Sequence, residues 1–310
     1  MVEKKVTIIG AAITDVHAGP VSSNLFEAGS VPVENMAVTY GGDALNEAVM
    51  LSSLGVDSEL VSVVGDDENG KRILNYLKSS GINTDKITVC DGMTTGMNIV
   101  LNDASGERFF ITNPRSSLRR LSVEHILPHA DEFADIVCFA SMFVSHELGI
   151  KEMRKVFSKI KEKPSRVLIC DMTTAKKGEN IRDIAELLEY IDYIVPNEKE
   201  AALLTGESDI YKNIDIFRAH GAKNVVIKCG SAGCVYSDGK VTKNVPSFKV
   251  SAIDTTGAGD SFVAGFTYGL LKGSDIHTCC KYGNAVASYV VEQIGTTGIK
   301  LSDDDIGTRM

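Results

Sequence analysis

The chain has 310 residues, of which 44% are hydrophobic and 24% charged, proportions that exclude a disordered or collagen-like polymer. Lys and Arg number 32 against 41 Asp and Glu, for a net charge of −9. No basic run carries interleaved aromatic residues, so we expect no nucleic-acid partner. The apolar runs are shorter than the roughly 20 residues that cross a bilayer, so we expect no membrane partner.

The first apolar run, at residues 6–9, is too short for the hydrophobic region of a signal peptide. We interpret it as the first core strand of a cytoplasmic protein. The seven cysteines include no C-x-x-C pair and mostly lie in apolar runs, which indicates buried, reduced thiols. The six histidines have no metal-binding spacing, so zinc chemistry is not expected.

Short apolar runs without alternation are typical of strands covered on both faces. From about residue 120 onward they alternate with helical patterns, such as Ile150, Met153, Phe157 and Ile160. This alternation predicts an α/β fold with a mostly parallel central sheet and helices on both faces. The predicted strands are residues 6–9, 60–64, 136–139, 167–170, 193–195 and 225–228.

Two segments differ from this pattern. Residues 13–40 and 92–115 are extended and joined by loops, and in the second a turn at 103–106 separates two apolar runs. We interpret both as a small β-sheet lid. No internal repeat or linker is evident, so we expect a single domain over 1–310 with these lid segments inserted. Asp238 and Gly239 predict a late hairpin.

The first candidate site begins just after the first predicted strand. Asp15 lies just beyond the first strand, where ligands collect in open parallel sheets. Gly41 and Gly42 open a helix and allow a ligand to approach closely. Asn46 in that helix could present its amide to a polyol, although Asn near a helix start is often a local hydrogen-bonding residue.

A second candidate site begins where the chain turns at Pro196 into a helix. Asn197 and Glu200 lie three residues apart at its start. They could form a capping box that satisfies the first helical amides. Alternatively, their oxygens could hold a hydrated Mg²⁺ beside nucleotide phosphates.

The strongest local motif is a glycine-rich turn at residues 254–260 that opens a helix. The N–H groups of Gly257, Ala258 and Gly259 would favour an anion at the positive end of the helix dipole. Asp260 could deprotonate an attacking hydroxyl while these amides stabilise a transferring phosphoryl group. The alternative is a tight glycine turn before an ordinary helix.

Taken together, the motifs at 41–48, 64–70, 95–96, 197–206, 228–233 and 254–260 resemble, in order, those of the ribokinase-like (PfkB-type) carbohydrate kinases. The resemblance covers nearly the whole chain. It implies a three-layer α/β/α fold with a small β-sheet lid, and an ATP-dependent enzyme that phosphorylates a primary hydroxyl of a sugar or nucleoside. In many relatives the lid also forms a homodimer.

The resemblance also implies roles for single residues. Asp260 matches the general base, and the amides of Gly257, Ala258 and Gly259 match the anion hole. The substrate-binding positions are Asp15, Gly41, Gly42 and Asn46. The positions near ATP are Asn197, Glu200, Lys228, Gly230, Gly233 and Asn284, with Glu200 beside Mg²⁺. A K⁺ site in relatives corresponds to Asp254, Thr256 and Gly295.

The acceptor is left open by two departures from the family patterns. Asp43 and Ala44 replace the Lys-Gly of ribose kinases, and Asp171 is not followed by the Asn and Arg of many fructokinases. A small sugar is the leading acceptor, and a nucleoside is the alternative. A catalytically silent sugar-binding regulator is a further alternative, against which the intact glycine turn and Asp260 argue.

Overall fold

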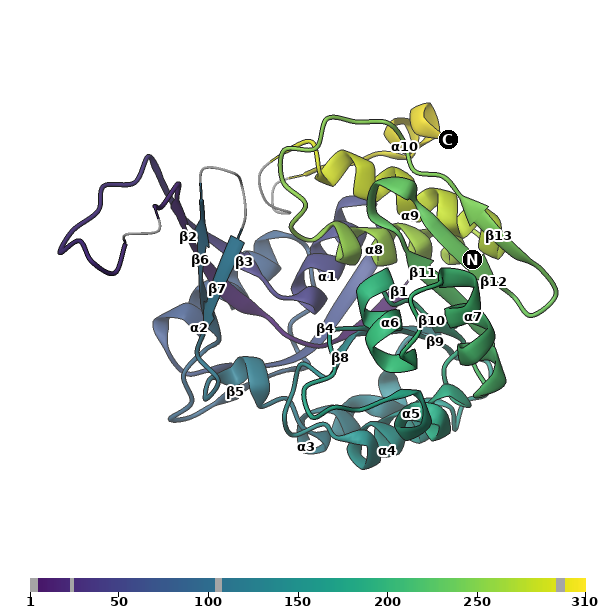
Figure 1. The fold of residues 1–310 in the computed structure, drawn as a ribbon. Coiled ribbons are helices and arrows are strands. Elements are labelled where there is room, and N and C mark those ends of the chain that lie inside the picture. The colour runs from purple at the N-terminus through teal and green to yellow at the C-terminus, as the bar shows by residue number, and fades with distance from the viewer. Residues whose placement is uncertain (1–4, 23–24, 104–107, 294–298) are drawn as a thin grey trace.

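The computed structural model describes residues 5–22, 25–103, 108–293 and 299–310. The strands of its larger sheet are β1 (Lys5–Ile9), β4 (Asp57–Gly65), β5 (Ile87–Cys90), β8 (Ile136–Met142), β9 (Val167–Met172), β10 (Tyr193–Ile194), β11 (Asn224–Lys228), β12 (Cys234–Ser237) and β13 (Thr242–Val245). In the described residues their order is β13-β12-β11-β10-β9-β8-β1-β4-β5 (Figure 1). The pairs from β11 to β5 are parallel, and β12 and β13 add an antiparallel hairpin at one edge. All six predicted strands and the late hairpin are therefore present.

Helices cover both faces of this sheet. One face carries α1 (Asp43–Ser53), α2 (Glu68–Ser79), α8 (Ala258–Leu271), α9 (Ile276–Val290) and α10 (Asp303–Arg309), and the other carries α3 (Val123–Ile126), α4 (Ile150–Ile160), α5 (Ile181–Leu188), α6 (Glu198–Thr205) and α7 (Ile210–Ala219). Successive strand residues point to opposite faces, so Ile8 enters the first core and Ile9 the second. The predicted three-layer fold is confirmed. No helix in the described ranges is long and apolar enough to cross a membrane.

A second, smaller sheet stands to one side of the main body (Figure 1). Its strands are β2 (Ile13–Gly19), β3 (Asn35–Gly41), β6 (Met97–Asn102) and β7 (Arg108–Thr112). Among the described residues their order is β3-β2-β6-β7, with β2 and β6 parallel and the outer pairs antiparallel. The two segments predicted to be extended thus form a separate small sheet. Of the turn predicted at 103–106, residues 104–106 lie outside the described residues.

The seven cysteines are free thiols, and all except the half-buried Cys90 are buried. Burial raises the pKa of Cys138 and Cys170 well above the usual value. Little reactive thiolate forms under such conditions, so these cysteines act as small apolar core residues, as the sequence predicts.

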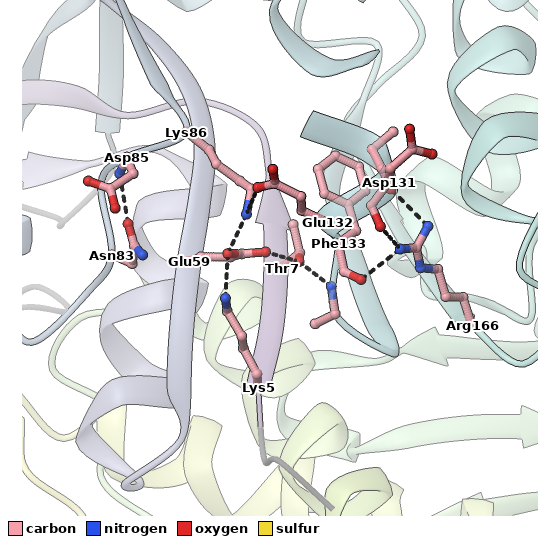
Figure 2. Close-up of polar contacts among 12 residues, drawn as sticks. Lys5, Thr7, Glu59, Asn83, Asp85, Lys86, Asp131, Glu132, Phe133 and Arg166 are labelled. Carbon is pink, nitrogen blue, oxygen red and sulfur yellow. Dashed lines mark hydrogen bonds and ion pairs between the residues drawn. The ribbon is translucent and has the colours of Figure 1, made fainter. Parts of the chain in front are cut away.

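The amino ends of the parallel strands are joined by a buried ionic network (Figure 2). Glu59 of β4 accepts hydrogen bonds from the Thr7 hydroxyl at 2.5 Å and from the Lys86 ammonium at 2.8 Å. Lys5 lies 2.8 Å from the same carboxylate. Nearby, the Arg166 guanidinium donates to the carbonyls of Ala130, Asp131 and Phe133. Each buried charge in this region therefore has hydrogen-bond or ion-pair partners.

Candidate active site

The glycine-rich turn lies at the carboxyl ends of the parallel strands and opens α8. Gly257 has a φ of 67°, a left-handed conformation that favours glycine. The Ala258 amide donates to the Thr255 carbonyl at 3.3 Å, whereas the amides of Gly257 and Gly259 have no backbone acceptor in the described part of the chain. Two of the three predicted amides are thus available to an anion at the start of α8.

Asp260 lies in the first turn of α8 and is partly buried. The Asn46 amide donates to Asp260 Oδ2 at 2.7 Å, which fixes the carboxylate across the gap between α1 and α8. Desolvation, followed by the negative charge of Asp43, raises the pKa of Asp260 well above its usual value. A carboxylate with a raised pKa is a stronger base, so this environment suits proton abstraction from a hydroxyl.

Asp260 faces a cavity of about 340 Å³ that also receives residues of the smaller sheet. The strand register places Asp15 beside Asn98, whose amide donates to Asp15 Oδ1 at 3.0 Å. Burial raises the pKa of Asp15, and the Asn98 hydrogen bond opposes this effect. The volume lies within the roughly 300–1,000 Å³ of small-molecule sites, and the carboxylates can accept hydrogen bonds from a polyol.

The glycine pair before α1 allows these groups to meet. A Cβ on Gly41 would lie 2.2 Å from Asp15 Oδ2, and one on Gly42 would lie 2.6 Å from the Ala11 carbonyl oxygen. Gly42 has a φ of 97° and lines the cavity, together with Asn46. Gly41 is not among the lining residues, so it makes room for Asp15 rather than contacting the cavity itself.

A second cavity, of about 400 Å³, lies on the other side of the glycine turn. Lys228, Gly230, Gly233 and Asn284, the positions that the resemblance implies lie near ATP, all line this cavity. Gly233 is essential to its shape, because a Cβ there would lie 2.1 Å from the Val245 carbonyl oxygen. Gly259 lines both cavities, so the two meet at the start of α8.

The side chain of Asn284 has a partner already. Its amide donates to the carbonyl oxygens of Val245 at 3.0 Å and Pro246 at 3.2 Å. Asn284 therefore holds the loop after β13 in place at the wall of the cavity. This contact accounts for its position and leaves its carbonyl oxygen as the atom able to meet a ligand.

Lys228 lies beneath the glycine turn, where its Nζ is 3.3 Å from the position of a Cβ on Gly259. It forms an ion pair with Asp171 at the end of β9. Desolvation alone would lower the pKa of Lys228, but the charges of Asp171 and Glu200 raise it above the usual value. A protonated ammonium thus lines the second cavity close to Gly259, the residue that lines both cavities.

Comparison with known proteins assigns this architecture to a family. The sequence model of the pfkB family carbohydrate kinases matches residues 3–303. The chain belongs to this family of carbohydrate kinases. It is 27% identical to the 2-dehydro-3-deoxygluconokinase of Haemophilus influenzae, over 94% of this chain and 95% of that protein. It is 29% identical to the ribokinase of Bacillus subtilis, over 83% of each chain.

Solved structures show the same fold. The Thermotoga maritima ribokinase matches with a TM-score of 0.82 at 22% identity, over 98% of each chain. The Arabidopsis thaliana ribokinase, complexed with ribose and ATP, gives a TM-score of 0.81 at 22% identity, over 98% of this chain and 97% of that one. An Escherichia coli protein in complex with ATP and Mg²⁺ gives 0.81 at 24% identity, over 98% of each chain.

In this family member, Asn197 and Glu200 form a full capping box. Asn197 Oδ1 accepts from the Glu200 amide at 2.9 Å, and Glu200 Oε2 accepts from the Asn197 amide at 2.8 Å. Burial raises the pKa of Glu200 to about 7. Neither residue lines either cavity. Asn197 and Glu200 therefore cap the start of α6, and Glu200 Oε1 takes no part in the capping box.

The proposed cation ligands lie before the glycine turn. The Thr256 amide donates to Asp254 Oδ1 at 2.7 Å, and the buried Thr256 hydroxyl has no hydrogen-bond partner in the described ranges. Gly295, the third predicted ligand, lies outside the described residues. The described part of the chain contains no group of three His, Cys, Asp or Glu residues that could hold a metal ion.

Sequence reasoning gave no site role to four charged residues around this candidate site. Asp171 pairs with Lys228, and Glu47 is buried one residue after Asn46. Arg119 and Lys176 line the cavity that contains Asp15. A carboxylate at the end of a buried strand was a usable signal for Asp171, whereas the other three are on segments whose orientation only the packing decides.

Proposed function

We propose that this kinase transfers the γ-phosphoryl group of ATP to a primary hydroxyl of a small sugar. The observation that carries the proposal is the position of Asp260: it lines one cavity and follows Gly259, which lines both and whose amide, like that of Gly257, has no backbone acceptor among the described residues. A nucleotide in one cavity and an acceptor in the other would bring their reacting groups together there. Positioning of this kind supplies much of the catalysis of phosphoryl transfer.

In the proposed reaction, Asp260 accepts the proton of the acceptor hydroxyl while that oxygen attacks the γ-phosphorus and ADP leaves. The Asn46 amide keeps the carboxylate oriented. The amides at the start of α8 and the Lys228 ammonium stabilise the negative charge that develops on the phosphoryl oxygens. Asp15 holds the acceptor by accepting hydrogen bonds from its hydroxyls.

We further propose that ATP binds with Mg²⁺, as in the Escherichia coli neighbour. Mg²⁺ retains several waters and needs only one or two protein carboxylates. Glu200 lines neither cavity, so its Oε1, which the capping box leaves unused, would act on the ion through bound water. When bound, the ion would offset charge on the β- and γ-phosphates. Asn197 would contribute by fixing Glu200 through the capping box. The fit for K⁺ rests on the unpartnered hydroxyl of Thr256, and K⁺ binding, like a cytoplasmic location, stays a prediction.

The smaller sheet is proposed to close over the acceptor and to join two subunits. The strand register places Asp15, Asn98 and Thr112 on the face toward the cavity. On the opposite face the register brings together exposed apolar side chains: Met36, Val38, Ile99, Phe109 and Ile111. An exposed apolar patch of this kind marks an association surface, so we propose a homodimer formed through it.

The decisive experiment measures ADP release from ATP with a panel of acceptors. The panel contains ribose, fructose and adenosine, so that it separates a sugar kinase from the nucleoside alternative. Acceptor-dependent ADP release with a sugar supports the proposal, and preference for adenosine would replace it with the alternative. Acceptor binding without ADP release would instead favour a regulator.

A further inference from the structure

Two cations face the cavity that contains Asp15 and Asp260. Arg119 ends the short 3-10 helix Ser117–Arg119, which follows β7, and Lys176 lies in the loop after β9. Both line the cavity. Neither is needed to activate a hydroxyl, which is the task assigned to Asp260, and a neutral sugar offers no charge to either of them.

The partners of these cations are few. Arg119 Nη1 donates to the Val144 carbonyl at 2.7 Å, which uses one of the five guanidinium N–H groups. Within the described ranges, neither cation has a carboxylate at ion-pair distance, and Lys176 has no hydrogen bond. Partial desolvation, followed by the positive charge of Arg119, lowers the pKa of Lys176, while much of its side chain remains exposed. Two cations thus line a cavity whose carboxylates, Asp15, Asp43 and Asp260, form no ion pair with them. An anionic group on a ligand could pair with them instead.

Asp43, the acidic residue whose charge acts on both Arg119 and Lys176, forms no ion pair with either of them. Asp43 at the start of α1 is the negative charge that acts most strongly on both Arg119 and Lys176, yet its carboxylate is hydrogen-bonded to Ser141. The adjacent Arg120 behaves differently, because it pairs with Glu147 at 2.6 Å on the surface. The chain therefore contains an ordinary surface arginine beside one that is directed into the cavity.

We infer that Arg119 and Lys176 form an anion subsite, and that the acceptor is a sugar derivative carrying a carboxylate or a phosphate besides the hydroxyl that is phosphorylated. The inference rests on the proposed kinase function. A guanidinium with free N–H groups suits both anions, because it can donate two parallel hydrogen bonds to them. The carboxylates of Asp15 and Asp260 would hold the hydroxyl-bearing part of the same molecule.

The phosphates of ATP are the other anions near this site. The cavity assigned to the nucleotide contains Lys228 but neither Arg119 nor Lys176. These two cations are instead in the cavity with Asp15 and Asn98, residues of the smaller sheet. The geometry thus places the anion subsite on the acceptor side.

The test compares acceptors by ADP release at saturating ATP. The panel contains gluconate and 2-dehydro-3-deoxygluconate as sugar acids, fructose 6-phosphate as a sugar phosphate, and glucose, ribose and fructose as neutral sugars. We expect an anionic acceptor to give the highest kcat/KM, and its class distinguishes carboxylate from phosphate. Arg119→Gln should raise the KM for that acceptor about 10- to 100-fold, the effect of a lost charged hydrogen bond, while KM for ATP stays within about twofold.

Matched controls are available at the neighbouring positions. Arg120→Gln and Lys177→Gln remove exposed cations outside the cavity and should leave both KM values unchanged. Arg119→Lys should restore part of the acceptor affinity, and Lys176→Gln tests the subsite independently if Arg119→Gln does not fold.

Three outcomes would overturn the inference. Highest activity with a neutral sugar, together with an unchanged KM in Arg119→Gln, would show that no anion is recognised, while the kinase function would stand. A raised KM for ATP alone would assign the two cations to the nucleotide. If none of the acceptors in the panel supports ADP release, the proposed function is removed, and this inference is removed with it.

Discussion

Glu59 and Glu47 are both completely buried. Glu59 lies near the amino ends of the parallel strands, and Glu47 lies near their carboxyl ends. Glu59, at the amino ends of the strands, is surrounded by Thr7, Lys5 and Lys86, and their hydrogen bonds outweigh desolvation and lower its pKa (Figure 2). Glu47 of α1 has no hydrogen-bond partner on either oxygen in the described chain. Desolvation and the charge of Asp260 raise its pKa well above the usual value.

The difference separates structural from functional use of buried charge. A buried carboxylate with full partners stabilises the fold, because its hydrogen bonds offset the loss of solvation. At the carboxyl ends, Glu47, Asp43, Asp171 and Asp260 surround Lys228, so the carboxylates outnumber the cation. Crowding of like charge opposes stability and raises the pKa of the proposed base.

The largest expected effect is a loss of activity on substitution at the carboxyl ends of the strands, where the carboxylates are crowded. Asp260→Asn should lower kcat about 10²–10⁴-fold, because a general base contributes about that much, while the fold remains intact. The measurement is ADP release at saturating substrates, accompanied by a denaturant melt. Near wild-type turnover in this variant would eliminate Asp260 as the base.

At the amino ends of the strands, where Glu59 has full hydrogen-bond partners, a substitution should lower stability rather than activity. Glu59→Gln removes the buried anionic partner of Lys86 and leaves it, among the described residues, only the exposed Glu132, at 3.4 Å. Removal of one member of a buried ion pair costs about 3–5 kcal/mol. The free energy of unfolding from urea melts measures this loss, while kcat per folded molecule should be unchanged. In wild type, a lowered folded pKa means that this stability is present above the usual pKa of 4.5 and is lost as the pH falls through the lower folded value.

The acceptor cavity offers an intermediate effect. Asp15→Ala should raise the KM for the acceptor about 10- to 100-fold, since each hydrogen bond from a sugar hydroxyl to a charged group is worth ~1.5–3 kcal/mol. KM for ATP should change little, because Asp15 lines only the acceptor cavity of the two. Equal losses for both substrates would indicate a structural role.

A smaller effect is expected from Glu200. Its pKa of about 7 in the folded protein exceeds the usual 4.5, so its contribution to stability is present below pH 4.5 and is lost as the pH rises through about 7. Glu200→Gln keeps an acceptor for the capping box but cannot ionise. Between pH 4.5 and about 7 the unfolding free energy of wild type should therefore fall by about 1–3 kcal/mol more than that of Glu200→Gln. Denaturant melts at several pH values measure this difference.

The smallest expected change makes the comparison with Glu59 direct. Glu47→Gln removes a carboxyl that has no partners, so the unfolding free energy should stay within about 1 kcal/mol of wild type or rise. A urea melt beside Glu59→Gln checks this contrast between two equally buried glutamates. A loss as large as that of Glu59→Gln would mean that Glu47 has partners of structural importance.

The sequence by itself determined the fold class, the smaller sheet and the core of the candidate site. The glycine turn and Asp260 are contiguous, so a helix start with free amides and an acid in its first turn can be predicted from local spacing. The capping box of Asn197 and Glu200 is local as well, and its sequence pattern left capping and Mg²⁺ binding open because both use the same oxygens.

Only the tertiary structure decided which distant charges meet. Asp171 and Lys228 end strands that are two positions apart in the sheet, and Arg119 reaches the cavity from a 3-10 helix that follows the smaller sheet. Glu47 occupies an ordinary helical position, and its burial depends on the packing of α1 against α8 and the sheet. Burial and pairing set the charge state of such groups, and neither can be predicted from local sequence because both depend on residues far away in the chain.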